Sequence, residues 1–311
     1  VSTLELMEDI CDEHTYFEWS NLVERLLGYL LKSSEDHDLI ANHILCACAA
    51  LIRWAKIKED QSVRIHAEQL LHQIINQQSD EGWFPEYGGA DPGYQTLSMC
   101  YLAEIYADTH DEVVLKSAAR SLNFLKYNVH PDGSFGGVYG SRSTKLCYPL
   151  GFEYFSELLP DANDIRCVLR SSIESYRVVT LQCMDDPNLV PMFNFYARSA
   201  RLLHERSEAP RKSRLLPCEL DVVWQKYFPE AGILIHHEPS CHTVIGISKG
   251  GVVYHFKNRR LVTQNHGIVI RHRSRSHWCS TQTQARLVEF KGTEIRLDVE
   301  FIRINRQLQT P

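Results

Sequence analysis

Apolar residues recur at spacings of three and four positions through the first two thirds of the chain. This spacing places them on one side of a helix, which predicts a series of amphipathic helices. The run at residues 39–57 is apolar on most sides, so we expect it to be an inner helix. Pro160 is expected to end the sixth helix. The predicted helices cover residues 16–32, 39–57, 62–76, 94–107, 111–127, 148–158, 164–181 and 192–205.

The pattern changes near residue 217. Residues 206–217 are polar, basic and flanked by proline, as linkers are. Beyond them, short runs rich in β-branched residues are separated by glycine-containing turns, which predicts an antiparallel sheet. These runs lie at residues 233–235, 243–247, 251–256, 267–271, 285–290 and 294–305. We therefore expect a mainly α domain at 1–210 and an all-β domain at 218–311, which is small or truncated because its last run reaches the end of the chain.

Two of the predicted helix connections are long and rich in glycine and aromatic residues, at 80–95 and 130–148. Loops of this kind on a helical scaffold are typical of a concave binding site. They lie about one double helical hairpin apart, which indicates a repeated position in the fold. Paired helices joined alternately by short and elaborate loops predict an incomplete (α/α) toroid. We expect it to be followed by an antiparallel β-sheet or sandwich.

Charge is distributed unevenly along the chain. The net charge is −6, but residues 216–311 carry 13 Lys and Arg against 8 Asp and Glu, so this part is basic. A basic surface attracts phosphates or acidic sugars. The basic run at 255–277 lacks interleaved aromatic residues, so we expect no nucleic-acid partner. No apolar run is long enough for a bilayer, and we expect no membrane span.

Ten cysteines are scattered along the chain without a C-x-x-C pair. We expect free thiols of a reducing compartment and no metal site, because no second ligand pair lies at zinc spacing. The sequence shows no secretory signal pattern, and it has no initiator methionine, so the chain can be a fragment. These features favour a cytoplasmic location without fixing it.

The first residues of two predicted helices point to a family. Asn42 and His43 open the apolar helix in ANHILCACAALIRWAKI, and Tyr94 opens the helix that follows the first rich loop. A segment YFPEAGILI, at 227–235, then leads into the β domain. In this order of elements, nearly the whole chain resembles the heparinase II/III-like polysaccharide lyases. The resemblance implies a toroid followed by a β domain.

The same resemblance implies roles for individual residues. Asn42 and His43 are expected to hold and neutralise the carboxylate of a uronate, and Tyr94 to act as acid or base. A β-domain histidine completes the family's site, and here CHTVIGISKGG offers His242, with His255 and His266 as further candidates. We expect no cofactor, and a metal in the β domain, known in some relatives, stays open.

The residue types in the two loops agree with such a substrate. β-Elimination needs a neutralised carboxylate, a base for the C5 proton and an acid for the leaving oxygen. Arg142 offers a planar fork for a carboxylate or sulfate. The sequence therefore predicts action on an acidic polysaccharide, with a β-eliminative lyase as the first hypothesis. The aromatic residues that can stack on sugar rings are Trp83, Tyr87, Tyr139 and Tyr148.

Several alternatives stay open. Glu86 and Asp91 can form the carboxylate pair of a glycoside hydrolase, or pair with Arg142. The scaffold can also bind or assemble a glycan without catalysis, and the aromatic residues can fill a core. The loop PDGSFGGVYGSRSTKLCY also resembles the repeats of terpenoid cyclases and prenyltransferases, which we attribute to shared toroid architecture.

Overall fold

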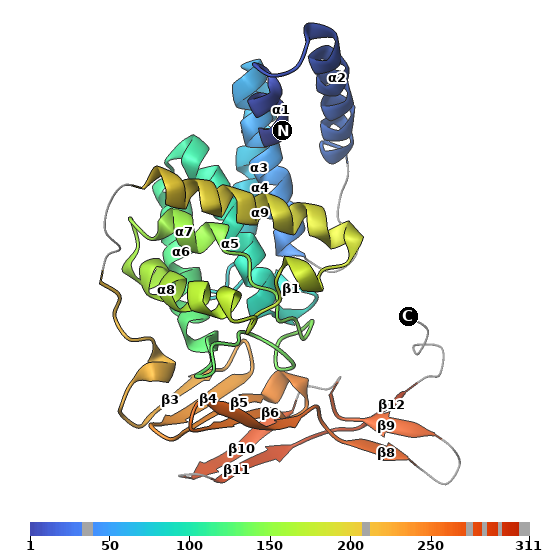
Figure 1. Cartoon of the computed structure of the whole chain (residues 1–311). Coiled ribbons are helices and arrows are strands. Elements are labelled where there is room, and N and C mark those ends of the chain that lie inside the picture. Colours follow the sequence, from blue (N-terminus) through green and yellow to red (C-terminus); the bar gives the residue numbers. More distant parts are fainter. Residues whose placement is uncertain (33–39, 207–211, 272–275, 282–284, 292–293, 305–311) are drawn as a thin grey trace.

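The helices and the strands of this chain form two separate layers. A computed structural model describes residues 1–32, 40–206, 212–271, 276–281, 285–291 and 294–304. The helices fill the upper body, and the strands of the C-terminal third lie below them (Figure 1). The prediction of a mainly helical part followed by an antiparallel β part is thus confirmed. The predicted linker at 206–217 includes residues 207–211, which lie outside the described residues.

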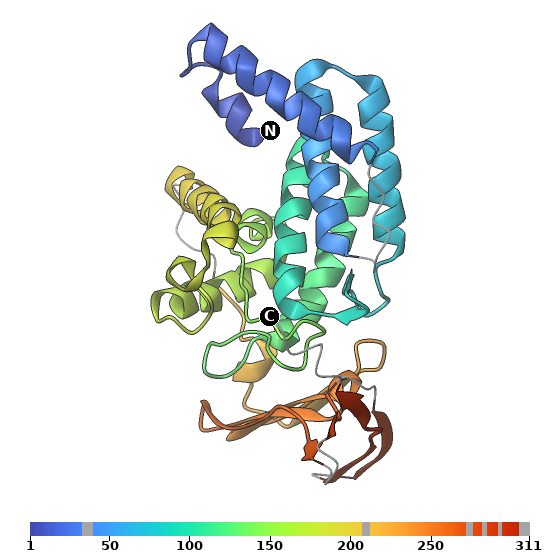
Figure 2. The same ribbon diagram turned by 90° about the vertical axis from the view of Figure 1, so that its right-hand side faces the viewer.

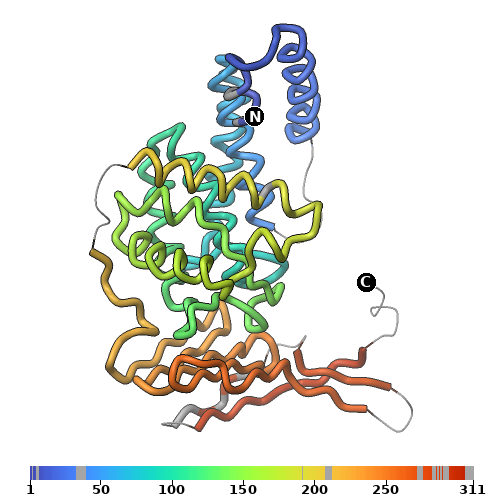
Figure 3. The backbone as a smooth tube through the Cα atoms, in the orientation of Figure 1, coloured from blue at the N-terminus to red at the C-terminus, as the bar shows by residue number. Residues whose placement is uncertain are grey.

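The chain runs through its helices in sequence before it enters the sheet (Figure 3). The first one was not predicted, because it is only six residues long. The helices are α1 (Ser2–Met7), α2 (Glu13–Leu30), α3 (Ala41–Lys58), α4 (Gln61–Asn76), α5 (Pro92–Thr109), α6 (Glu112–Leu125), α7 (Leu150–Phe155), α8 (Pro160–Glu174) and α9 (Asp186–Glu205).

Aspartates mark the starts of several helices. The Asp60 carboxylate accepts the backbone N–H of Val63 at the start of α4, and Asp91 accepts that of Tyr94 at the start of α5. Such caps satisfy backbone N–H groups that have no partner within the helix. Pro160 was expected to end a helix, but it is the first residue of α8. Proline is favoured there because its missing N–H has no partner to bond in the first turn.

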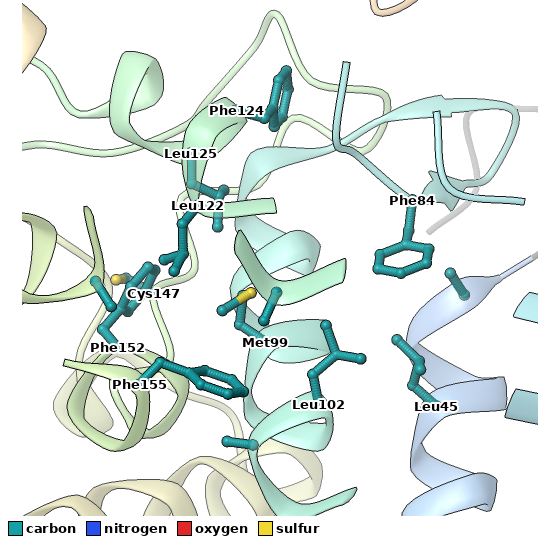
Figure 4. Close-up of a cluster of buried hydrophobic side chains, with 14 of the residues drawn as sticks. Leu45, Phe84, Met99, Leu102, Leu122, Phe124, Leu125, Cys147, Phe152 and Phe155 are labelled. Atoms are coloured by element: carbon teal, nitrogen blue, oxygen red, sulfur yellow. The ribbon is translucent and has the colours of Figure 1, made fainter. Parts of the chain in front are cut away.

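Helices α3, α5 and α7 pack against one another in succession, and each also packs against a partner helix. Helix α3 packs against α4 and α5, α5 against α6 and α7, and α7 against α8 and α9. Helix α5 has buried residues on all its sides, as a helix enclosed by others must. The core between these helices is apolar, and Figure 4 shows part of it. Fully buried members of this core include Leu45, Phe84, Met99, Leu102, Leu122 and Phe155.

The β part is built from hairpins. Its main sheet has five antiparallel strands in the order β3-β4-β5-β6-β7, so each strand pairs with its sequence neighbour. A three-stranded sheet orders β12-β9-β8, and β10 pairs with β11. The strands are β3 (Trp224–Phe228), β4 (Ile233–Glu238), β5 (Cys241–Gly246), β6 (Val252–Lys257), β7 (Arg260–Asn265), β8 (Val269–Arg271), β9 (His277–Cys279), β10 (Arg286–Lys291), β11 (Glu294–Asp298) and β12 (Ile302–Ile304).

The main sheet packs against the lower ends of the helices (Figure 2). Phe124 of α6 meets Phe228 of β3 edge-on, with ring centroids 5.1 Å apart. The Glu81 carboxylate accepts the backbone N–H groups of Glu230 and Ala231, each at 2.9 Å. Apolar packing and charge-assisted hydrogen bonds therefore both fix the helices on the sheet.

Candidate functional site

The two rich loops lie against each other at the helix ends that face the sheet (Figure 1). The backbone N–H of Ser141 donates to Ala90 O at 2.9 Å, and its hydroxyl donates to Glu86 O at 2.6 Å. The first loop also contains a small hairpin of β1 (Pro85–Glu86) and β2 (Gly89–Ala90). Residues 80–95 and 130–148 thus form one structure, which we call the rim.

The Asp91 side chain holds the two loops together. Its carboxylate accepts the backbone N–H groups of Tyr94 at 3.1 Å and Arg142 at 2.8 Å, and the Thr144 hydroxyl. Burial raises the pKa of Asp91, and these hydrogen bonds oppose the rise. Gly140 packs so closely on this carboxylate that an added Cβ would lie 2.8 Å from it. Asp91 therefore organises the rim from within.

Asn42 and Glu86 form a second buried pair. The Asn42 backbone N–H and side-chain amide donate to the two Glu86 carboxylate oxygens at 2.8 and 2.7 Å. Asn42 is 4% exposed and Glu86 is fully buried. In this conformation neither side chain can touch a polysaccharide, and both join α3 to the rim. His43 follows Asn42 and is exposed at the same edge.

A cationic and phenolic cluster lies on the accessible side of the rim. The Arg142 guanidinium lies over the Tyr87 ring, 4.2 Å from its centroid. The Tyr87 and Tyr94 ring centroids are 6.2 Å apart. Burial raises the pKa of Tyr94, and the positive charge of Arg142 opposes that rise, so the phenol keeps its proton at neutral pH. We call Tyr87, Tyr94, Arg142 and Lys249 the rim cluster.

Lys249 reaches this cluster from the β part. Its ammonium donates to Ser141 O at 3.0 Å, next to Arg142 in the chain. Burial lowers the pKa of Lys249, and Asp91 opposes this shift while Arg142 reinforces it. In the sequence, Lys249 precedes Gly250 and Gly251 in one of the glycine-containing turns expected between strands. Only the packing of that turn on the rim reveals its place, and no local sequence signal indicates it.

The other three aromatic residues of the prediction are packed inside the protein or bound to neighbours. Trp83 is half-buried, and its indole N–H donates to Glu81 at 3.0 Å. Tyr139 is buried, and its hydroxyl lies 2.9 Å from His130 Nε2. Tyr148 is buried against Phe195, with ring centroids 5.7 Å apart. In this conformation Tyr139 and Tyr148 have structural positions, and neither offers a face for a sugar ring.

His242 lies elsewhere, in the sheet. Its imidazole is buried, and its Nδ1 lies 3.1 Å from Nδ1 of His237 across the β4–β5 pair. Burial lowers the pKa of His242 well below the usual range, and the neighbouring histidines add to this effect. Within the described residues, no hydrogen bond, ion pair or ring contact connects His242 with Tyr94 or Arg142. Of the four residues implied by the family resemblance, Asn42 is therefore bound to Glu86 and His242 to His237, and neither forms a hydrogen bond or ring contact with Tyr94 in the described part of the chain.

The described ranges of the chain contain neither a metal-ligand cluster nor a membrane-spanning helix. No three His, Cys, Asp or Glu side chains in these ranges are grouped as ligands of one metal ion. No helix in them is both long and apolar enough to cross a membrane. All ten cysteines lie in these ranges and are free thiols.

Comparison of the chain with protein-family models, curated proteins and solved structures gave no match.

Proposed function

We propose that this protein acts on a uronate-containing polysaccharide and cleaves it by β-elimination at the rim cluster. The observation that carries the proposal is the grouping of a protonated phenol, Tyr94, with the cations Arg142 and Lys249. Cations that surround a uronate carboxylate make its C5 proton more acidic, because they stabilise the negative charge that develops when this proton leaves.

Each part of the reaction is assigned to a residue of the rim cluster or to His43 at the start of α3. Arg142 and Lys249 neutralise the carboxylate. His43, exposed beside Asn42, is the base that takes the C5 proton, and the released electron pair forms the C4–C5 double bond. The C4–O bond then breaks, and Tyr94 protonates the leaving oxygen. Tyr87, held beneath Arg142, provides an aromatic surface next to the bound sugar.

We also propose that the helical part is an incomplete (α/α) toroid. In such a fold, alternate helices line the inside and their partners lie outside. The successive packing of α3, α5 and α7, each against its own partner among α4, α6 and α8, supports this arrangement. A toroid presents connecting loops at one rim, where 80–95 and 130–148 lie together.

A non-catalytic glycan-binding protein is the second candidate. It is favoured by Asn42, whose amide is bound to Glu86 and is not available for a uronate. Hydrolysis is less well supported, because the Glu86 and Asp91 carboxylates are both buried and engaged in structural hydrogen bonds. A hydrolase needs one carboxyl group that protonates the leaving group and another that reaches the anomeric carbon or a water.

The experiment is a panel of uronate glycans incubated with the purified chain. New ultraviolet absorbance from unsaturated uronides is the expected result. Release of reducing ends without this absorbance would support hydrolysis instead. Binding without either product would support the second candidate, in which case Arg142→Gln and Lys249→Gln should each weaken binding.

A further inference from the structure

A separate polar groove lies between the helical part and the sheet. It has a volume of about 580 Å³ and is formed by α8, residues 130–133 at the start of the second rich loop, the segment before β3 and the turn between β6 and β7. Ligand pockets commonly have volumes of several hundred Å³, so a small sugar fits. Four arginines line it: Arg177 follows α8, Arg214 lies before β3, and Arg259 and Arg260 lie at the β6–β7 turn.

Three of these four guanidinium groups are available to a ligand. Arg214 is paired with Asp161 and Asp164. Arg177, Arg259 and Arg260 are exposed, and none of them has a carboxylate within ion-pair distance among the described residues. The carboxylates that line the groove are used locally, because Asp132 accepts the N–H of Ser134 and Glu219 accepts that of Leu216. The groove therefore carries an excess of positive charge for a bound anion.

The backbone of Arg259 is unfavourable for an arginine. Asn258 and Arg259 form the two-residue turn between β6 and β7, with φ angles of 50° and 60°. Such turns favour glycine at the second position, because a side chain there is strained. Strain of this kind often occurs at functional positions. The strained turn places Arg259 in the groove.

A smaller pocket of about 90 Å³ continues the groove inward. The two share Pro131, Cys218, Glu219 and Arg259. His237 and His242 line the inner pocket.

The hydrogen bonds of His237 and His242 show which of their ring nitrogens can still accept a hydrogen bond. His237 Nε2 lies 2.8 Å from Leu220 O, and a carbonyl only accepts, so this nitrogen carries the proton. In neutral His237, Nδ1 is then an acceptor, and His242 Nδ1 is its donor. His242 Nε2 is left as a buried acceptor with no partner among the described residues. A ligand group that bonds to this nitrogen must therefore be a donor, such as a hydroxyl group.

We propose that this groove binds a sugar that carries a phosphate or sulfate ester. The ester oxygens contact Arg177, Arg259 and Arg260, whose planar forks match oxyanions. A sugar hydroxyl enters the inner pocket and donates to His242 Nε2. This site is distinct from the rim cluster and does not depend on the function proposed for it.

The test is calorimetric titration of the full chain with glucose 6-phosphate, glucose 6-sulfate, glucose and inorganic phosphate. At least one ester should bind, and the tighter one identifies the ester chemistry. Glucose and inorganic phosphate should bind about tenfold more weakly than that ester, because each lacks half of the contacts. The proposal is overturned if neither ester binds, or if inorganic phosphate alone binds as tightly.

Single substitutions test the arginine contacts and the histidine contact separately. Arg259→Gly should weaken ester binding about tenfold without lowering the melting temperature, because glycine tolerates the left-handed turn. Arg25→Gln removes an exposed charge on α2 and should leave ester binding unchanged. His242→Phe should weaken ester binding but not phosphate binding. Wild-type ester affinity in both Arg259→Gly and Arg177→Gln would contradict the assignment.

Discussion

Burial distinguishes the predicted side chains that are bound inside the protein from those that stay accessible at the rim. The side-chain amide of Asn42 donates to the Glu86 carboxylate, whereas Arg142 is exposed on the accessible side of the rim. The sequence predicted a role at the site for both residues. It could not distinguish them, because burial depends on the partner that lies 44 residues away. His130 was not predicted as a buried residue for the same reason, because the fold of the second rich loop brings its hydrogen-bond partner Tyr139 to it.

Replacing Asn42 tests its structural position. Asn42→Ala removes the side-chain amide that donates to the buried Glu86 carboxylate. We expect the free energy of unfolding to fall by about 2 kcal/mol, as for a hydrogen bond to a charged group. Urea denaturation measures it, with Asn123→Ala on the exposed side of α6 as the matched control. Equal stability of the two variants would show that the pair does not hold the rim.

His130 gives the stability a pH dependence. Burial lowers the pKa of His130 to about 4, with Lys145 adding to this effect and Asp132 opposing it. The unfolded chain therefore takes up a proton on this residue first as the pH falls below about 6.5. The contribution of buried, neutral His130 to the free energy of unfolding is therefore fully present above about pH 6.5. It is lost progressively as the pH falls to about 4.

The variant His130→Gln isolates this contribution. Between pH 7 and pH 5, the wild type should lose about 2 kcal/mol more stability than the variant, because only the wild type has this proton uptake. The raised pKa of Asp91 acts in the opposite direction, since protonation then favours the folded state. That effect is present in both proteins and cancels in the comparison. Denaturation curves that shift in parallel at both pH values would contradict the prediction.

At the scale of elements, periodicity predicted most of the helices, because one apolar side is enough to define each of them. The boundaries were less accurate, as for the seventh helix, which was predicted to start at 164 and instead begins at Pro160. The β1–β2 hairpin inside the first loop was not predicted. Its strands are two residues long, so they show no alternating pattern.

The contact of Glu81 with the sheet couples the two parts of the chain. Its carboxylate accepts the N–H groups of Glu230, Ala231 and the Trp83 indole. Glu81→Ala should lower the free energy of unfolding by about 2 kcal/mol, because these bonds to a charged acceptor are lost together. Thermal and urea unfolding measure it, with the exposed Asp80→Ala as control. A change no larger than that of the control would mean that apolar packing alone holds the junction.

For the whole molecule, the order of a helical part and an antiparallel β part could be predicted from sequence. The position of the site could be predicted only in part. The rim was found because its glycines and aromatic residues are concentrated in two loops. Lys249 and the arginine groove were not found, because each is assembled across the junction from segments distant in sequence. The resemblance brought His242 into the catalytic set, and the fold places it in a different pocket.

We propose for the molecule as a whole that the rim cluster carries out elimination with Tyr94 as the acid. The most direct measurement is the initial rate of ultraviolet absorbance increase on a uronate glycan, for the wild type, Tyr94→Phe and Tyr29→Phe. Tyr29 is exposed on α2, so its loss is the matched control. We expect the Tyr94→Phe rate to fall at least about a hundredfold, as for loss of a general acid, and the control to keep the wild-type rate. A Tyr94→Phe variant with the wild-type rate, or a wild type that produces no absorbance on any uronate glycan, would contradict the claim.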